Sequence, residues 1–457
     1  MFVVSLLLAA VSSAAAAPVQ LHPQNPHYFL FRGKPAVLVT SGEHYGAVLN
    51  LNFDFRPYLD ELKRCGFNLT RTFSGTYREI PGSFKIRGNT LAPRDGRYCC
   101  PWAQHDGKFD LDRFDDGYFQ RLREFVTEAG RRGIVVEYTL FCPLYEEALW
   151  NVNPMNARNN RNGIGRIPRT EVFTLKHPEL LKRQLTFVRK AVTELNAFDN
   201  VYFEICNEPY FGGVTLDWQR RVADEIVAVE RGLPQKHLIA QNIANGKAEV
   251  KNPHPAVSIF NFHYASPPDA VSLNAALRKP IGFDETGFQG AGDRVYRRQA
   301  WEFLMAGGAV FSNLDYSFTA DHENGGVTVK DPTPGGGGPA LRQQLGFLKR
   351  FVEGFDLVHL QPTKAFIAKV EPRELGGEVQ ALADRRSGAY AIYLAKGPRV
   401  RLTLKLPARG YRVRWMGPRD GRTLREESID AVGQAAKPVI LSSPDYTEDI
   451  AARITPR

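Results

Sequence analysis

Eight short apolar segments, separated by longer amphipathic stretches, limit the fold of this 457-residue chain more than any other feature. They are nearly continuous in apolar side chains, which is typical of strands buried on both faces of a parallel sheet. Their ranges are 36–42, 68–74, 133–141, 201–207, 237–243, 258–264, 280–286 and 308–316. Eight such strands alternating with helices predict a closed barrel whose outer face the helices cover.

The stretches between these strands carry helix signals. Residues 56–66 and 115–133 each end at a glycine just before the next strand, and 178–195 and 217–232 repeat the amphipathic pattern. Glycine is common just after the last turn of a helix. A doubly wound open sheet is the alternative, but the glycine-rich phosphate turn of that fold is absent after the first strand.

The pattern changes after the glycine-rich segment 332–340 and one more helix, 341–355. From about residue 360, short strands of alternating polarity are separated by Gly, Pro and Asp turns, which predicts a small antiparallel β-sandwich. We therefore expect an α/β fold, with a (β/α)8 TIM barrel over residues 18–355 and a C-terminal β-sandwich domain over 356–457. The second domain either stabilises the barrel or binds glycan, and its short helical link favours the first role.

Residues 1–17 are predicted to be a signal peptide. An apolar run from Phe2 to Val11 is followed by small residues, with cleavage after Ala15 or Ala16, and the run is shorter than the ~20 residues of a membrane-spanning helix. No Lys or Arg precedes the run, so a buried N-terminal helix is the alternative. We expect a secreted or periplasmic protein, and no later run is apolar enough to predict a membrane association.

The net charge and the cysteines bear on whether the protein binds nucleic acid, forms disulfides or holds a metal. The net charge is +10 at pH 7, but the Lys and Arg residues are scattered, which argues against nucleic acid as a partner. Five cysteines cannot all pair, and their spacings match no zinc site. Cys142 and Cys206 lie near the ends of neighbouring predicted strands, so one disulfide between them is an alternative. Buried free thiols are the favoured prediction. The sequence predicts neither a metal nor an organic cofactor.

Two of the eight strands end in glutamate. Glu208 stands in "CNEPYF" at the end of the fourth strand, and Glu285 in "GFDETG" on the seventh. In a parallel barrel the C-terminal strand ends line the mouth where active sites lie. The fourth and seventh strands lie across the ring from each other, so we expect the two side chains to converge, as glycoside hydrolysis requires.

Over residues 30–320 the chain resembles the clan A glycoside hydrolases, and within them the cellulase-like family five. The resemblance rests on Asn207-Glu208-Pro209 at the end of the fourth strand, together with Glu285 at the end of the seventh. It implies that Glu208 is the acid/base and Glu285 the nucleophile. It also implies that Asn207 binds the 2-hydroxyl of the sugar.

Other strands supply companions to these residues. By the resemblance Arg71, in "NLTRTF", binds the nucleophile, although Glu204 offers it a second, structural partner. The sixth strand gives His263 and Tyr264, adjacent here where the family separates its His and Tyr by one residue, and each has a plain core role as its alternative. Asp284, beside the nucleophile, is expected to face the other way because side chains alternate along a strand.

Aromatic and polar loop residues are candidates for contacts with the sugar, since loops usually carry specificity. They are His44, Tyr45, Phe141, Tyr145, Trp150, Tyr210 and Phe211. The sequence departs from the family after the third strand, where a histidine pair is missing. It departs again after the eighth strand, where Asp315 and Tyr316 stand near the place of a tryptophan. These departures predict a divergent member, or a separate related family, with its own substrate.

These residues predict a secreted retaining β-glycosidase that hydrolyses a poly- or oligosaccharide by double displacement. A transglycosylase with the same residues is the enzymatic alternative. A carbohydrate-binding protein that has lost catalysis is the alternative from another class, and the joint presence of Arg71, Asn207, Glu208 and Glu285 argues against it. The sugar, its linkage, endo or exo action and the oligomeric state stay open.

Overall fold

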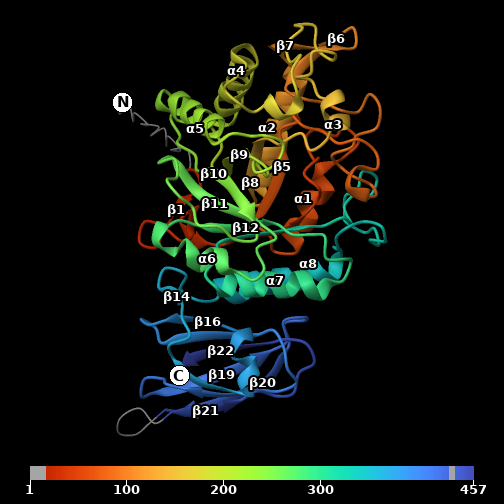
Figure 1. Ribbon diagram of the computed structural model, residues 1–457. Coiled ribbons are helices and arrows are strands. Elements are labelled where there is room, and N and C mark those ends of the chain that lie inside the picture. The colour runs from red at the N-terminus through yellow and green to blue at the C-terminus, as the bar shows by residue number, and fades with distance from the viewer. Residues whose placement is uncertain (1–16, 432–437) are drawn as a thin grey trace, which may run out of the picture.

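The computed structural model describes residues 17–431 and 438–457, so the predicted signal peptide lies, except for its last residue, outside the described residues. The predicted barrel is confirmed: eight parallel strands form one sheet in the order β4-β13-β12-β11-β10-β9-β8-β5 (Figure 1). The strands are β4 (Leu38–Gly42), β5 (Leu69–Phe73), β8 (Val135–Phe141), β9 (Val201–Cys206), β10 (Ile239–Asn245), β11 (Val257–His263), β12 (Ile281–Glu285) and β13 (Val310–Leu314).

The two end strands of this sheet, β4 and β5, are joined through the residue that precedes β5. The amide nitrogen of Asn68 donates to the carbonyl of Val39 at 3.3 Å, and its side-chain oxygen accepts from the Val39 amide at 3.0 Å. An asparagine side chain thus replaces one rung of the strand ladder, and the ring is nearly closed. Asn68 is therefore part of the barrel framework.

Helices cover the outside of the barrel. Side-chain oxygens of Asp54, Asp115 and Thr215 accept hydrogen bonds from backbone N–H groups in the first turns of three helices, which satisfies donors that the helix itself leaves free. Gly133, with φ +74°, stands just after the C-terminal end of the helix that Asp115 caps. The helices are α1 (Phe55–Arg64), α2 (Asp116–Arg131), α3 (Glu147–Asn151), α4 (Pro178–Leu195), α5 (Leu216–Arg231), α6 (Asp269–Leu273), α7 (Asp293–Met305) and α8 (Pro339–Glu353). None of the helices described is long and apolar enough to cross a membrane.

Two small sheets were not predicted from the sequence. One precedes the barrel and consists of β1 (Gln20–Leu21), β2 (Phe29–Phe31) and β3 (Lys34–Ala36). The other is a hairpin of β6 (Trp102–His105) and β7 (Lys108–Phe114), inserted between β5 and α2. The hairpin follows a long irregular segment, 74–101, that reaches the barrel mouth and shapes the site described below.

The C-terminal domain is antiparallel, as predicted. One sheet has the order β14-β16-β17-β22-β19-β20 and the other β15-β18-β21, with a separate apolar core that includes Ile392, Leu402 and Trp415. The strands are β14 (Leu360–Pro362), β15 (Ile367–Glu371), β16 (Val379–Asp384), β17 (Ala389–Leu394), β18 (Arg401–Leu404), β19 (Gly410–Met416), β20 (Thr423–Asp430), β21 (Val439–Ser442) and β22 (Ile450–Pro456). The sequence did not predict β14, β20 and β22.

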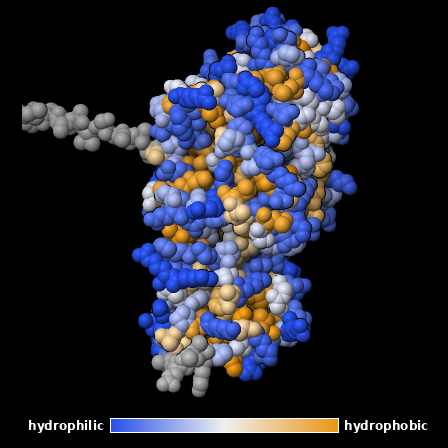
Figure 2. Space-filling view, turned by 60° about the vertical axis from the view of Figure 1, so that its left-hand side comes forward, coloured by the Kyte–Doolittle hydropathy of each residue, from blue (hydrophilic) through white to orange (hydrophobic). Residues whose placement is uncertain are grey.

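Helix α7 carries the contact between the two domains. The buried guanidinium of Arg297 donates to Asp449 at 2.9 Å, and Trp301 stacks on Tyr393 with ring centroids 5.0 Å apart. The larger barrel and the smaller β domain form the upper and lower parts of the molecule in Figure 2, where hydrophobic residues are scattered among hydrophilic ones. A buried ion pair and a stacked aromatic pair therefore fix the domain on the side of α7.

Candidate active site

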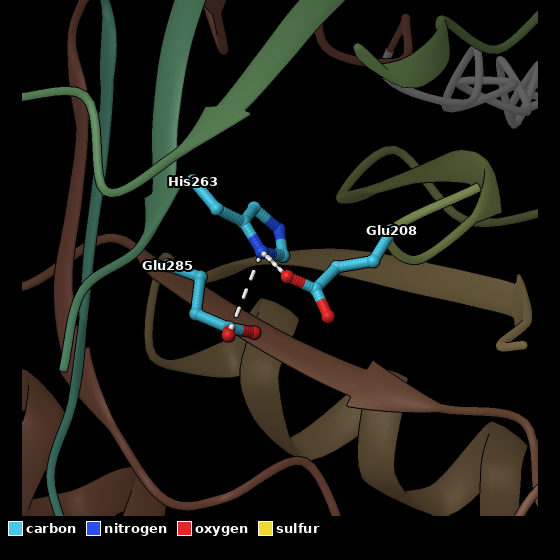
Figure 3. A group of neighbouring side chains, drawn as sticks. All are labelled: Glu208, His263 and Glu285. Carbon is cyan, nitrogen blue, oxygen red and sulfur yellow. Dashed lines mark hydrogen bonds and ion pairs between the residues drawn. The ribbon is translucent and has the colours of Figure 1, made fainter. Parts of the chain in front are cut away.

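Three side chains from three strand ends converge at the barrel mouth. Glu208 comes two residues after β9, His263 ends β11 and Glu285 ends β12. The Nδ1 atom of His263 lies 3.1 Å from Glu208 Oε1 and 3.5 Å from Glu285 Oε1 (Figure 3). One oxygen of each glutamate lies within 4.8 Å of the other. The predicted convergence of the two carboxyl groups is thus present in the structure.

The backbone at these positions takes an uncommon conformation. Tyr45, Glu208 and Tyr264 have φ angles of +60°, +35° and +50°, in the left-handed region that non-glycine residues seldom occupy. Each residue stands just beyond the end of a barrel strand. Such conformations cost free energy and gather at functional sites, where they turn a side chain toward a ligand.

Hydrogen-bond donors hold both oxygens of Glu285. The hydroxyl of Tyr264 donates to Oε1 at 2.6 Å, and the hydroxyl of Tyr45 donates to Oε2 at 2.9 Å. The Arg71 guanidinium lies 3.5 Å from the same Oε2. Two phenols and a cation therefore fix the carboxylate with its free face toward the mouth.

Glu208 has a different set of neighbours. The hydroxyls of Tyr145 and Tyr210 donate to its two oxygens at 2.7 and 3.2 Å. Burial opposes ionisation of this group, but the hydrogen bond and charge of His263, helped by the two tyrosines, outweigh it and lower the pKa of Glu208. Burial opposes the cation of His263 as well, yet the charges of Glu285 and then Asp284 raise its pKa well above the usual range.

Arg71 lies beneath the mouth and is fully buried. Its Nη2 atom donates to Glu204 Oε2 at 2.5 Å and to Asn207 Oδ1 at 2.7 Å. The two roles considered for Arg71 are therefore combined, because one guanidinium contacts both the structural acid Glu204 and Glu285. Asn207 in turn donates from Nδ2 to the hydroxyl of Tyr145 at 2.9 Å, which links it to Glu208.

The expectation for Asp284 is wrong. Its Oδ2 lies 3.5 Å from Arg71 Nη2 and its Oδ1 lies 3.6 Å from His263 Nε2, so it points into the barrel. Phe262 pairs with Phe283 while His263 pairs with Glu285, so Asp284 is an extra residue in the ladder. This irregularity breaks the strict alternation of side chains and brings two consecutive acids to the same guanidinium.

A small cavity of about 50 Å³ opens between these groups. Eight of the predicted residues line it: His44, Tyr45, Tyr145, Asn207, Glu208, Tyr264, Glu285 and Tyr316. Arg71 and His263 touch the carboxylates from behind, and Tyr210 reaches Glu208 from the surface. The lining also includes side chains that the sequence did not single out: Phe73, Tyr77, Glu79, Phe84, Ile86, Leu91, Cys142, Phe288 and Leu314.

Three predicted binding residues lie elsewhere. Phe141 is buried in the core, where its ring packs against Trp218 with centroids 5.1 Å apart. The indole N–H of Trp150 donates to the carbonyl of Ile167 at 3.2 Å, and the residue lines a separate surface hollow. Asp315 is fully buried and accepts from Arg342 at 2.7 Å, so it neutralises a buried cation instead of facing sugar. The Cys142–Cys206 disulfide is not formed, and both cysteines are buried thiols.

Two groups of side chains have the composition of metal ligands. One is Glu208, His263 and Glu285, and the other is Glu137, Glu204 and Asp284, deeper in the barrel. In the first group hydrogen bonds from tyrosines already hold the carboxylates. In the second, the guanidinium of Arg71 provides the positive charge among the acids. Both groups are thus clusters of charges held together by hydrogen bonds and ion pairs.

Neither a family model nor a curated protein matches the sequence. Solved structures do match its fold. A structure described as a glycoside hydrolase superposes with a TM-score of 0.66 at 14% identity, covering 96% of this chain and 97% of the other. A glycoside hydrolase family 5 protein from Bacteroides vulgatus gives 0.64 at 14% identity, covering 96% of this chain and 93% of the other.

A third structure, the endo-1,4-beta-mannanase from Rhizomucor miehei, superposes with a TM-score of 0.51 at 13% identity and covers 74% of this chain and 100% of its own. The first two matches span both domains of this chain, whereas the third leaves a quarter of it unmatched. At such identities the similarity establishes the fold. The chain thus has the barrel architecture of solved glycoside hydrolase structures, including one of family 5, at low sequence identity.

Proposed function

We propose that this protein is a retaining β-glycoside hydrolase, secreted by means of the segment 1–17, that acts on a poly- or oligosaccharide. The observation that carries the proposal is the approach of Glu208 and Glu285, whose oxygens come within 4.8 Å across an open cavity. Retaining enzymes hold their two carboxyl groups ~5–5.5 Å apart, whereas inverting enzymes need ~6.5–9.5 Å to admit a water molecule. The fold shared with glycoside hydrolase structures supports the same class.

In this proposal the reaction has two displacements. Glu285 attacks the anomeric carbon while Glu208 gives a proton to the leaving oxygen, so the glycosidic bond breaks as a glycosyl–enzyme ester forms. Glu208, now a carboxylate, takes a proton from water, which attacks the same carbon and releases Glu285. Asn207 lines the same cavity, where its amide can bind the 2-hydroxyl of the sugar.

The proton for the first step is held by a pair of groups. Because the pKa of Glu208 is lowered and that of His263 is raised, the proton of the resting pair lies on His263 Nδ1, 3.1 Å from Glu208 Oε1. The charge of Glu285 is one cause of the raised pKa of His263. We therefore expect activity to be greatest at acidic pH, where the pair carries a second proton.

The substitution Tyr145→Phe tests this assignment through the pH profile. It removes a hydrogen bond that lowers the pKa of Glu208, so that pKa rises. An acid catalyst must be protonated, and kcat/KM falls as pH rises through its pKa. We expect the alkaline limb of the kcat/KM profile to move to higher pH. Tyr446→Phe, which removes a phenol in the C-terminal domain, should leave the limb in place; an unmoved limb in Tyr145→Phe would contradict the assignment.

Hydrolysis of a panel of polysaccharides and aryl β-glycosides tests the function itself. The wild-type protein should release sugar from at least one member, and neither Glu208→Gln nor Glu285→Gln should retain that activity on unactivated glycosides. Transfer to an added sugar in preference to water would favour the transglycosylase. Binding without turnover in all three proteins would indicate a carbohydrate-binding protein instead.

A further inference from the structure

A third carboxylate faces the cavity. Glu79 is 4% exposed, and its Oε1 accepts from the hydroxyl of Tyr77 at 3.1 Å, while its Oε2 accepts from Asn89 Nδ2 at 2.5 Å. Its one charged neighbour among the described residues is His44, whose Nε2 lies 3.4 Å away. Burial disfavours the cation of His44, but the charge of Glu79 raises the pKa of this imidazole. Glu79 Oε2, which accepts from Asn89 alone among the described residues, keeps capacity for a further donor.

Two polar atoms beside Glu79 have no partner in the part of the chain that the structure describes. They are Nδ1 of His44 and the hydroxyl of Tyr316, and both residues line the cavity. Their rings lie 5.7 Å apart. Buried polar groups are nearly always hydrogen-bonded in folded proteins. An acceptor or donor brought by a ligand would complete this group.

Two aromatic rings in contact link Glu79 to each catalytic carboxylate. Tyr145 donates to Glu208, and its ring meets that of Tyr77, which donates to Glu79. On the other side, the ring of Tyr45, which donates to Glu285, neighbours His44 with centroids 5.5 Å apart. Because all three carboxylates line one cavity, we place the hydroxyls remote from the anomeric carbon on the side of Glu79.

The cavity is walled behind Glu79. Part of the irregular segment 74–101 packs so tightly that a Cβ added at Gly46 would lie 2.2 Å from the carbonyl oxygen of Thr90. A Cβ added at Gly88 would lie 2.4 Å from the Thr319 methyl. The segment is thus pressed against the loops that follow both β4 and β13. We take this packing to close the cavity on the side of Glu79, so that a glycan chain ends there.

Charge and size narrow the ligand further. Three glutamates line the cavity, and no Lys or Arg is found in the lining within the described residues. An anionic sugar would meet like charges at close range, which costs free energy. The cavity volume of about 50 Å³ is well below the ~300–1,000 Å³ typical of small-molecule pockets, so the site has room for no more than one sugar ring.

We infer that the cavity holds one neutral sugar, the non-reducing end of the substrate, and that Glu79, with His44 and Tyr316, binds its hydroxyls remote from the scissile bond. The protein then acts in the exo mode and releases terminal sugars one at a time. This inference rests on the proposed glycosidase function and adds the class of substrate and the mode of attack.

Paired substrates test the mode of action. Aryl β-glycosides of neutral hexoses, pentoses and their short oligomers are compared with the same compounds carrying a methyl ether on the terminal 4-hydroxyl, and with an aryl β-glucuronide. We expect the free neutral series to be cleaved and the other compounds to react at least ~100-fold more slowly, since the pocket has little space for the ether and no Lys or Arg to pair with the carboxylate. Equal rates on free and blocked compounds would overturn the exo mode and leave the glycosidase function standing. A preference for the glucuronide would overturn the neutral class, and no cleavage of any compound would reject both.

Glu79→Gln tests the binding residue. It keeps the size of the side chain but removes the charged acceptor, so kcat/KM on the free series should fall ~10- to 100-fold, the worth of one hydrogen bond to a charged group. The same substitution is measured on analogues that lack the hydroxyl at position 3, 4 or 6. For the analogue that lacks the hydroxyl bound by Glu79, kcat/KM should fall much less, because that contact is already absent. If Glu79 had a purely structural role, Glu79→Gln would lower kcat/KM equally on all analogues, and this result would overturn the assignment. Glu374 is an exposed carboxylate in the C-terminal domain, so Glu374→Gln is the matched control. It should leave kcat/KM unchanged both on the free series and on the analogues.

Discussion

Replacement of Glu285 by Gln should lower kcat by at least ~10⁴-fold, since loss of a covalent nucleophile is among the most damaging changes to an enzyme. The amide keeps the shape of the side chain but cannot attack the anomeric carbon. The loss should be similar for aryl glycosides with good and poor leaving groups, because both need the nucleophile in the first step. The measurement is the initial rate on a series of aryl glycosides whose phenols differ in pKa.

The shorter variant Glu285→Ala makes the same prediction specific. Azide can enter the space that the carboxylate leaves and attack from the same face, so added azide should restore turnover and give the α-glycosyl azide. Glu374→Gln is the control for charge loss and should behave as the wild type. A Glu285→Gln variant that keeps wild-type rates with an unchanged melting temperature would rule out the nucleophile role.

Replacement of Glu208 by Gln, unlike that of Glu285, should lower kcat by an amount that depends strongly on the leaving group. A general acid contributes ~10²–10⁴-fold, so kcat for poor leaving groups should fall by about that amount. A dinitrophenolate leaves without a proton, so the first step should hardly change for that substrate. The second step then lacks its base, and the glycosyl–enzyme should accumulate as a burst of released phenol.

The azide experiment separates the two acids. In Glu208→Ala, azide approaches from the leaving-group face after the ester has formed, so the product should be the β-glycosyl azide. The α-azide from this variant, or a rate loss independent of the leaving group, would mean that the two roles are exchanged. Melting temperatures near that of the wild type are needed for both variants, because Glu208 and Glu285 share the contact with His263.

Most of the barrel could be predicted because its signals are local. An apolar run ending in a polar residue marks each strand, and a glycine before the strand marks the helix end, so all eight strands were placed within a few residues of their observed bounds. The ring order then places Glu208 and Glu285 face to face. Their convergence was predictable because the barrel topology determines it, even though 77 residues separate them in the sequence.

The residues that were missed depend on long-range packing. Glu79 sits in an irregular segment without periodicity, and only contacts with distant loops bring it to the cavity. Asp284 was assigned to the wrong face because one irregular position in the ladder with β11 breaks the alternation. Asp315 follows a barrel strand as a catalytic residue would, but its partner Arg342 lies on α8, which no local pattern reveals. Such errors belong to positions where tertiary contacts override the strand period.

The stereochemistry of the first product tests the account most directly. Proton NMR during the first minutes of hydrolysis of an aryl β-glycoside distinguishes the two anomers before they interconvert. Attack by Glu285 followed by water on the same carbon inverts twice, so we expect the β-anomer of the free sugar to appear first and the α-anomer only later. Initial release of the α-anomer would mean a single displacement, and would contradict a nucleophile held within 4.8 Å of its acid partner.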